Sequence, residues 1–180
     1  MTDAASIAPP DTVPGRACGS CMQCCKLPAI AELAKPSAKW CVNARPGNGC
    51  AIYADRPPVC RKFYCDWMLN PKLGPEWKPD KAKFLIGTAA NGAVSVLVDP
   101  AAPAAWRAAP YYDALKVFAS RLVERGDVLT IHAGRRMTVV LPDRDEEIGP
   151  VPDDHVLVVR QRLVDGKLRY EAVVEAKPAS

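Results

Sequence analysis

The residues with the most evident chemistry in this chain are its eight cysteines, which crowd into one short part of it. Four of them fall in the stretch "CGSCMQCC", and residues 66–180 contain none. The full set is Cys18, Cys21, Cys24, Cys25, Cys41, Cys50, Cys60 and Cys65. Cysteines that served only as small apolar core residues would be scattered along the chain. Their concentration predicts one local constellation of thiols, and metal chelation is the leading interpretation.

The spacing of the first cysteines suits a tetrahedral zinc ion. Cys18 and Cys21, separated by Gly-Ser, can reach one ion from a tight turn. Cys24 and Cys25 are adjacent and cannot both point the same way from regular structure, so one of them serves a different site or none. Eight thiols can make two four-thiolate sites, or one such site plus spare cysteines. The wider gaps among the later cysteines lack a second Cys-x-x-Cys knuckle, which argues against a plain zinc ribbon.

An iron–sulfur cluster is the alternative. The run Cys18-x-x-Cys21-x-x-Cys24 also opens the ligand set of bacterial ferredoxins, whose fourth cysteine lies elsewhere. The continuation departs from that pattern, because Cys25 follows at once and no Cys-Pro pair appears. We favour zinc by a small margin, since the turn-rich surroundings of the Cys-x-x-Cys knuckle suit it. A thioredoxin-type dithiol is disfavoured because no strand precedes Cys18.

The net charge and the first residues of the chain limit which classes of partner are expected. The net charge of +4 is mild, so no nucleic-acid partner is expected, but residues 16–65 carry eight cations against two anions, a balance of +6. These cations either form a solvated surface or offset thiolates. Residues 1–15 have neither a basic start nor an apolar run, and no stretch is apolar enough to span a bilayer. We therefore expect a cytoplasmic protein with reduced thiols and no membrane partner.

The cysteine pattern resembles a known family, the zinc- or iron-chelating cysteine-cluster proteins with a Cys-x-x-Cys-x-x-Cys-Cys motif. "CGSCMQCC" followed by "GCAIYADRPPVCRKFYC" carries the resemblance, over about residues 16–67. The family's later motif falls on Cys50, Ile52, Tyr53, Arg56, Pro57, Cys60, Arg61 and Phe63. The resemblance implies metal chelation by the eight cysteines and leaves the metal open. A flagellin lysine methylase shares the domain, but this chain is shorter and has no obvious S-adenosylmethionine loop, and no catalytic set stands out.

The chain divides into three parts in an α+β arrangement. Residues 1–15 are expected to be a disordered lead-in, residues 16–80 a metal-stabilised cysteine module, and residues 81–180 an antiparallel sheet. In the module we expect short helices over 21–26 and 29–33, and a third from Pro57 or Pro58 to about Met68, capped by Asp55. Arg56 and Arg61 are expected to bond loop carbonyls or ligand sulfurs, with aromatic residues packed around Cys60 and Cys65.

The sequence pattern of residues 81–180 predicts three hairpins and one helix. The turn signals are Asn91-Gly92, Gly134-Arg135-Arg136 and Asp165-Gly166, each between alternating apolar strands. Pro110 opens and Gly126 closes a helix with one apolar face, formed by Leu115, Phe118, Ala119 and Leu122. The pattern therefore predicts an antiparallel sheet of about six strands with one packed helix.

Overall fold

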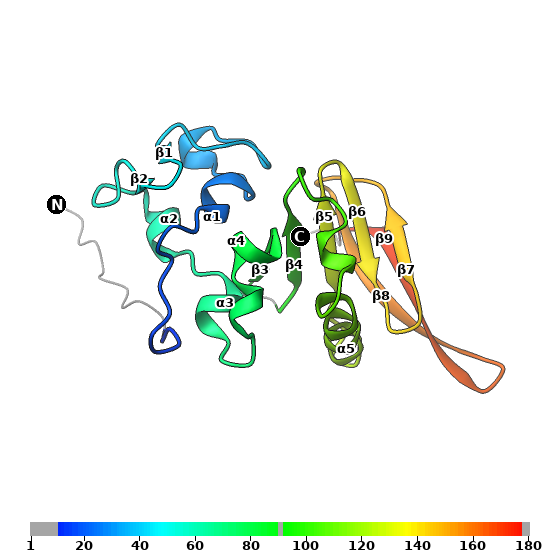
Figure 1. Cartoon of the computed structure of the whole chain (residues 1–180). Helices are drawn as coiled ribbons and strands as arrows, with labels where there is room; N and C mark the ends of the chain where they lie inside the picture. Colours follow the sequence, from blue (N-terminus) through cyan, green and yellow to red (C-terminus); the bar gives the residue numbers. More distant parts are fainter. Residues whose placement is uncertain (1–10, 90–91, 178–180) are drawn as a thin grey trace.

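The computed structural model describes residues 11–89 and 92–177 (Figure 1). Most of the predicted lead-in, residues 1–10, and the turn residue Asn91 lie outside the described residues. Near the start of the described residues, the backbone N–H of Val13 donates to the carbonyl of Met68 at 2.8 Å. This bond attaches the start of the described chain to the cysteine module, residues 16–80.

The cysteine module consists of turns and short elements, as its composition predicts. They are α1 (Gln23–Lys26), η1 (Ala31–Leu33), β1 (Ala44–Arg45), β2 (Gly49–Cys50), α2 (Pro58–Lys62), α3 (Asp66–Leu69), η2 (Pro75–Trp77) and α4 (Pro79–Ala82). The prediction of one helix from Pro57 to Met68 is wrong. Phe63 and Cys65 adopt extended backbone (ψ 123 and 156), which separates α2 from α3. Asp55 does not cap α2, because its N-cap position is Pro57 and no side chain bonds there.

The central sheet has five strands in the order β3-β4-β5-β6-β7. They are β3 (Phe84–Thr88), β4 (Val94–Val98), β5 (Leu129–Ala133), β6 (Arg136–Val140) and β7 (Asp145–Ile148). The prediction of a wholly antiparallel sheet of about six strands is wrong, because β4 and β5 run parallel, with Val94 opposite Leu129. Parallel neighbours need a long crossover, and residues 99–128 supply it. The fold is therefore α+β with a mixed sheet.

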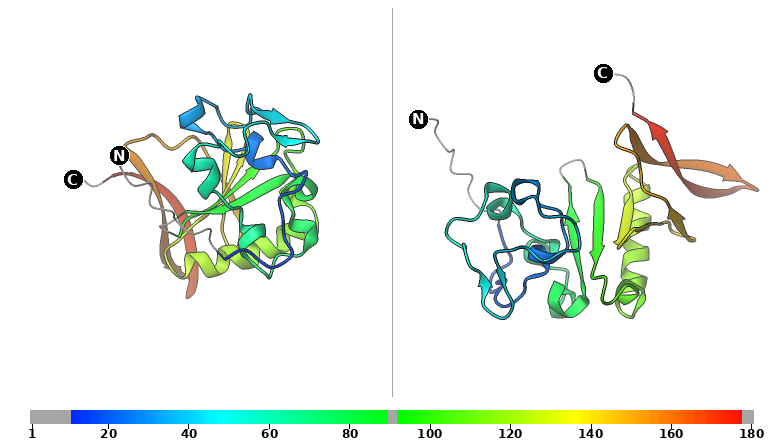
Figure 2. Two further views of the ribbon diagram at one scale, coloured as in Figure 1. Left: turned by 90° about the vertical axis from the view of Figure 1, so that its left-hand side faces the viewer. Right: turned by 90° about the horizontal axis from the view of Figure 1, so that it is seen from above.

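Helix α5 (Tyr111–Val123) forms that crossover and packs on one face of the sheet (Figures 1 and 2). Its predicted apolar face is confirmed: Leu115, Ala119 and Leu122 are buried, and Phe118 packs partly against the same core. The helix rests on the apolar side chains that alternate along the strands, among them Val96 and Ile131. After the helix, Gly126 takes the left-handed φ of 79°, which a glycine adopts without strain.

The last two strands, β8 (His155–Val164) and β9 (Lys167–Ala176), pair with each other as a separate hairpin. The predicted Asp165-Gly166 turn is confirmed, and both residues have positive φ. Leu157 and Val159 from β8 pack with Val139 and Leu141 of the sheet region. The hairpin is thus a second small layer rather than the continuation of the sheet.

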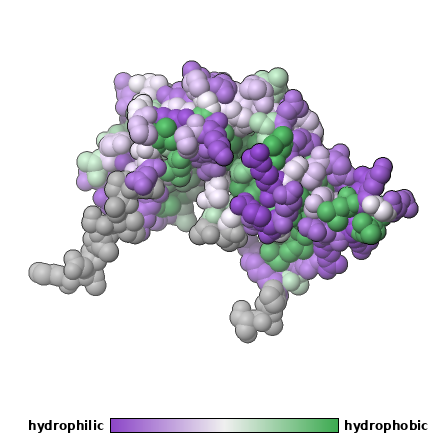
Figure 3. Space-filling model, turned by 90° about the horizontal axis from the view of Figure 1, so that it is seen from below, coloured by the Kyte–Doolittle hydropathy of each residue, from purple (hydrophilic) through white to green (hydrophobic). Residues whose placement is uncertain are grey.

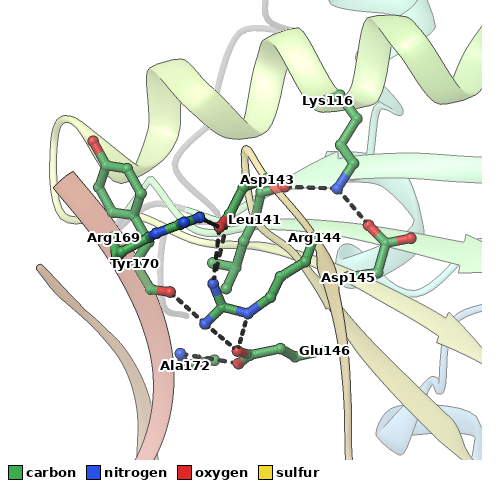
Figure 4. Close-up of polar contacts among 9 residues, drawn as sticks. All are labelled: Lys116, Leu141, Asp143, Arg144, Asp145, Glu146, Arg169, Tyr170 and Ala172. Atoms are coloured by element: carbon green, nitrogen blue, oxygen red, sulfur yellow. Dashed lines mark hydrogen bonds and ion pairs between the residues drawn. The ribbon is translucent and has the colours of Figure 1, made fainter. Parts of the chain in front are cut away.

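Charged side chains around β7 hold the hairpin in place (Figure 4). Arg144 donates to the Glu146 carboxylate at 2.7 Å and to the carbonyl of Tyr170 at 2.6 Å. Glu146 in turn accepts the backbone N–H of Ala172 at 3.1 Å. The acidic β7 sequence "DEEI" lacks the alternation that predicts a strand, and the bonds to Arg144 and Ala172 explain the charge of Glu146.

The outer half of the hairpin projects away from the rest of the chain (Figure 1). Its exposed apolar residues are Leu163, Val164 and Leu168, and apolar surface is visible at the corresponding end of the space-filling view (Figure 3). Within residues 11–89 and 92–177, no helix is both long and apolar enough to cross a membrane.

Candidate functional site

The structure brings all eight cysteines to one end of the molecule, the end formed by the cysteine module (Figure 1). They come from separate short segments. Cys18 and Cys21 lie in the loop before α1, Cys24 and Cys25 on α1, Cys41 before β1, Cys50 on β2, Cys60 on α2 and Cys65 directly before α3. All eight are free thiols. They line two adjoining pockets, described next.

The smaller pocket has a volume of about 30 Å³ and contains four cysteines in its wall. These are Cys18, Cys21, Cys24 and Cys65, which we name the first tetrad. Apolar side chains, including Met68 and Leu85, close the remainder of the pocket. Leu85 belongs to β3, so the first tetrad lies where the module meets the edge strand of the central sheet.

The larger pocket has a volume of about 340 Å³ and is lined by every cysteine except Cys65. Four of these cysteines line this pocket alone: Cys25, Cys41, Cys50 and Cys60, which we name the second tetrad. Apolar residues such as Ile30 and Leu33 form much of the wall, and Arg56 lines it as well. The two pockets therefore share Cys18, Cys21 and Cys24, whereas the second tetrad lines only the larger pocket and Cys65 only the smaller one.

The break between α2 and α3 separates two of the ligand candidates. Cys60 lies within α2 and lines the larger pocket, whereas Cys65 follows the break and lines the smaller one. The extended backbone at Phe63 and Cys65 makes this possible. Phe63 itself stands between the two pockets and lines both. The single helix expected over this segment is thus interrupted at the point that places Cys60 at the larger pocket and Cys65 at the smaller one.

The adjacent pair Cys24 and Cys25 joins the two tetrads. Cys24 lines both pockets and Cys25 only the larger one, so both thiols line the larger pocket, and the expectation that one of the pair serves a different site or none stays a prediction. Their thiols are hydrogen bonded, which raises the pKa of Cys24, burial raising it further. The same bond lowers the pKa of Cys25 to about 7, with help from the positive charges of Lys35 and Arg56 and against the effect of burial. Cys25 is therefore the thiol most readily converted to a thiolate.

Three thiols of the first tetrad, Cys21, Cys24 and Cys65, have raised pKa values and so resist ionisation without a partner. Burial, together with charge at Cys18 and Cys21, raises the pKa of Cys65 to about 11 against the opposing effect of backbone hydrogen bonds from Met68 and Trp67. Burial likewise raises the pKa of Cys21. A divalent cation would reverse this balance, because a coordinated thiol is held as thiolate. Metal binding at this tetrad would release protons.

A buried lysine lies beside the second tetrad. Lys35 is only 6% exposed, and its ammonium donates to the carbonyls of Lys26, Pro28 and Pro36 at 2.9, 2.5 and 3.1 Å. Burial lowers the pKa of Lys35, while charge on Cys41 and the other nearby thiols opposes that effect. A fixed cation next to four thiols offsets part of the negative charge that they would carry with a metal.

Both ends of α1 are attached to one carboxylate on the sheet side. Asp99, which follows β4 and is 6% exposed, accepts two bonds from the Lys26 ammonium at 2.6 and 2.7 Å. It also accepts a longer bond of 3.4 Å from the Gln23 amide and one of 2.9 Å from the N–H of Ala101. Cys24 and Cys25 lie between these two anchors. Asp99 thereby fixes the cysteines that join the tetrads.

Two further contacts fix the downstream part of the module. The guanidinium of Arg16 donates to the backbone carbonyls of Trp67, Asn70 and Leu73 and stacks over the Trp67 ring, and these bonds hold α3 and its following loop. Thr88 of β3 donates to the carboxylate of Asp66 at 2.8 Å. Arg16 and Lys35 belong to the basic excess noted in the sequence, but nothing in the sequence singles out Asp99.

The expectation for Arg56 is confirmed in one respect. Its Nε donates to the carbonyl of Tyr53 at 3.0 Å, and its guanidinium lies 3.8 Å above the Tyr53 ring. Tyr53 is nevertheless 64% exposed, so the predicted aromatic cluster is open to solvent at that residue. Phe63 and Tyr64 do line the smaller pocket beside Cys65.

The donor set suits soft metals, since thiolates select zinc, copper(I) and iron–sulfur centres. In the described part of the chain, no three His, Cys, Asp or Glu side chains are drawn together closely enough to form a metal group. The thiols surround the pockets without converging on one point. No known family model, curated protein or solved structure matches this chain.

Proposed function

We propose that this protein is a metal-chelating protein that binds zinc through cysteine thiolates, in a structural or adaptor role. The observation that supports this proposal best is that eight free thiols from separate short segments line two adjoining pockets, seven of them the larger and four the smaller. Four thiolates are the ligand number of a closed structural zinc site. Each tetrad draws on both halves of the module, as in the shared-ligand arrangement expected from the sequence.

The electrostatics of the module suit such sites. A divalent ion with four thiolates carries a net charge of −2, which is costly to bury without cations nearby. Lys35 and Arg56 lie at the second tetrad, where both act on the charge of Cys25. The first tetrad has Lys78 within electrostatic reach of Cys21. The basic excess of residues 16–65 is therefore partly located where thiolate charge needs compensation.

Metal would also contribute to folding of the module. Its buried large apolar residues are few, with Met22, Leu27 and Ile30 near α1 and Met68 and Trp77 farther along. A segment of short elements with so small a core gains stability from a bound metal. The proposal therefore includes the prediction from the sequence that a bound metal stabilises the fold of the module. The proposal requires a compartment that keeps thiols reduced.

An iron–sulfur protein is the second candidate, as an electron carrier or part of a protein-modifying enzyme. The size of the larger pocket favours it, because about 340 Å³ exceeds what a single coordinated ion fills. The Cys18-x-x-Cys21-x-x-Cys24 spacing points the same way. No substrate follows from either observation.

The two candidates are separated by anaerobic purification followed by metal analysis and a visible spectrum. A colourless protein with zinc supports the first, and a brown protein with iron and sulfide supports the second. Single Cys→Ser substitutions then test the ligand set, with Ser120→Ala on α5 as a control outside the module. Metal content should fall for substitutions in both tetrads. Metal loss confined to Cys18, Cys21, Cys24 and Cys25 would contradict the shared-ligand arrangement.

A further inference from the structure

The outer half of the β8–β9 hairpin is exposed on both of its faces and projects from the molecule (Figure 1). Residues 160–169 are all exposed, whereas Leu157 and Val159, earlier on β8, pack against the sheet region. Leu163 and Leu168, a cross-strand pair, bring apolar surface to this outer half. In the described part of the chain the hairpin pairs with no other strand, and a two-stranded ribbon by itself is only marginally stable in water.

The turn of the hairpin shows which backbone groups point outward. Two turn residues with positive φ join Val164 to Lys167, so this pair exchanges both backbone hydrogen bonds, and every second pair along the ladder does the same. The residues between these pairs direct their N–H and C=O groups to the two outer edges. On β9, two of them are engaged: the carbonyl of Tyr170 and the N–H of Ala172 bind side chains from the β7 region (Figure 4).

The outer edge of β8 is open by comparison. Its outward-directed residues are Leu157, Val159 and Gln161, and within residues 11–89 and 92–177 no hydrogen bond reaches their backbone groups. An open edge of this kind is a template for a further strand, which adds to the sheet through main-chain hydrogen bonds.

β8 lacks the usual devices that prevent edge pairing. It contains no proline, and its ten residues pair with β9 without a bulge. Arg160 and Arg162 would repel a second strand if they stood alone, but Glu175 and Glu171 of β9 lie 2.5 and 3.5 Å from them. The two glutamates therefore offset the charge that protects such an edge.

Charge restricts how the β8 edges of two chains can pair about a two-fold axis. Outward residues pair with outward residues, so the axis falls at a residue and not between two. An axis at Arg160 or Gln161 sets arginine opposite arginine, which is destabilising. An axis at Val158 instead sets Arg162 opposite Asp154 of the other copy, at both ends by symmetry. The side chains of Asp154 and Arg162 are 82% and 65% exposed, so both are accessible to a second chain.

We propose that β8 pairs antiparallel with β8 of a second copy of this chain, about a two-fold axis at Val158, so that the two hairpins join in one sheet. An axis at Val159 gives neither arginine an opposite charge. An axis at Leu157 pairs fewer residues and engages Arg160, which Glu175 already binds. The surface is self-complementary, as a two-fold interface requires, and it lies outside the cysteine module.

Sedimentation velocity on the full chain, kept reduced, tests the association over a concentration series. The expected result is a reversible dimer with twice the chain mass, both with and without a metal chelator, because β8 is remote in sequence from the cysteines. A chain that stays monomeric up to its solubility limit overturns the proposal. An association that disappears on chelation also overturns it, since the contact would then depend on the cysteine module.

Charge exchange tests the register. Arg162→Asp sets two carboxylates opposite each other at both ends, and Asp154→Arg sets two guanidinium groups there, so each variant should weaken dimerisation about tenfold. An equimolar mixture of the two variants should recover the native affinity as a heterodimer, because each end then joins one carboxylate to one guanidinium. The two positions lie roughly 26 Å apart along one strand, so a repair within one chain cannot imitate this recovery.

The control is Arg136→Asp, at an exposed arginine of β6, which should leave dimerisation unchanged. A dimer that neither exchange weakens, or a mixture that does not recover, overturns the assignment to β8. If Arg162→Asp disturbs the hairpin through its loss of the Glu171 pair, Asp154→Arg alone still decides, because a β8 dimer in this register must weaken.

Discussion

Removal of the Asp99 carboxylate is the sharpest test of how the sheet positions the cysteines. Asp99 follows β4 and binds Gln23 and Lys26, the two residues that flank the cysteine pair of α1. One substitution at a residue outside the cysteine module therefore perturbs a thiol of each tetrad. Asp99→Asn removes the charge and keeps the shape, and Asp99→Ala removes both.

The expected loss of stability follows from the burial of the Lys26–Asp99 ion pair. The side chains of Lys26 and Asp99 are 17% and 8% exposed, so their interaction is largely shielded from water. A hydrogen bond to a charged group contributes about 1.5–3 kcal/mol, and we expect Asp99→Asn to cost about 2 kcal/mol. Asp99→Ala leaves the ammonium, the Gln23 amide and the Ala101 N–H without their acceptor. Loss of one partner of a buried pair costs about 3–5 kcal/mol.

Thermal unfolding and zinc competition measure the two consequences. For a chain of this size about 1 kcal/mol shifts Tm by roughly 2–4 °C, so Asp99→Asn should lower Tm by about 4–8 °C. Asp99→Ala should also weaken zinc binding in competition with a chromophoric chelator, because α1 loses both anchors. Glu171→Gln is the control, since its pair with Arg162 is exposed and contributes at most about 1 kcal/mol.

The pH dependence gives an independent check. Burial raises the pKa of Asp99, but the bonds from Lys26, Ala101 and Gln23 outweigh it and hold the pKa below its usual range. A carboxylate with a lowered folded-state pKa stabilises the fold above its unfolded pKa, about 3.9, and loses that contribution as pH falls through the folded value. The stability difference between the native chain and Asp99→Asn should therefore shrink below about pH 4. Equal Tm and equal zinc affinity of the native chain and Asp99→Ala at pH 7 would refute the reasoning.

Four further outcomes are expected. Arg56→Ala should lower the Tm of the module by removing the bond to the Tyr53 carbonyl, and an unchanged melting curve would count against a structural role. Lys35→Met should weaken metal binding at the second tetrad more than Lys35→Arg, as measured by metal stoichiometry, because only the arginine keeps the charge; equal loss would exclude an electrostatic role. In the metal-free chain, iodoacetamide should alkylate Cys25 at a lower pH than Cys65, given pKa values of about 7 and 11; peptide mass spectrometry with the reverse order would contradict this. Chelation under reducing conditions should raise protease sensitivity within residues 16–80 and leave the sheet cooperative, and unaltered protection of the module would argue against metal-dependent folding.

The sequence determined the local elements wherever a short-range pattern was sufficient. Alternating apolar residues on either side of turn signals predicted the strands of three hairpins, and the 3.6-residue spacing of Leu115, Ala119 and Leu122 predicted the buried face of α5. Glycine and proline in turns predicted short elements in the cysteine module. The adjacency of Cys24 and Cys25 gave the expectation that one of them serves a different site or none, which stays a prediction because both line the larger pocket.

Only the tertiary structure decided how those elements combine. Whether β4 pairs with β5 in parallel depends on where α5 packs, and the strand sequences look the same either way. β7 was not predicted, because its charged residues do not follow a period of two: Asp145 binds Lys116 of α5, and Glu146 accepts the N–H of Ala172 on the hairpin. The partition of the thiols depends on the break at Phe63–Cys65 and on the contact of α1 with Asp99, seventy-odd residues away in sequence. Spacing constrains which cysteines are neighbours along the chain, but contacts between distant segments determine which cysteines share a pocket.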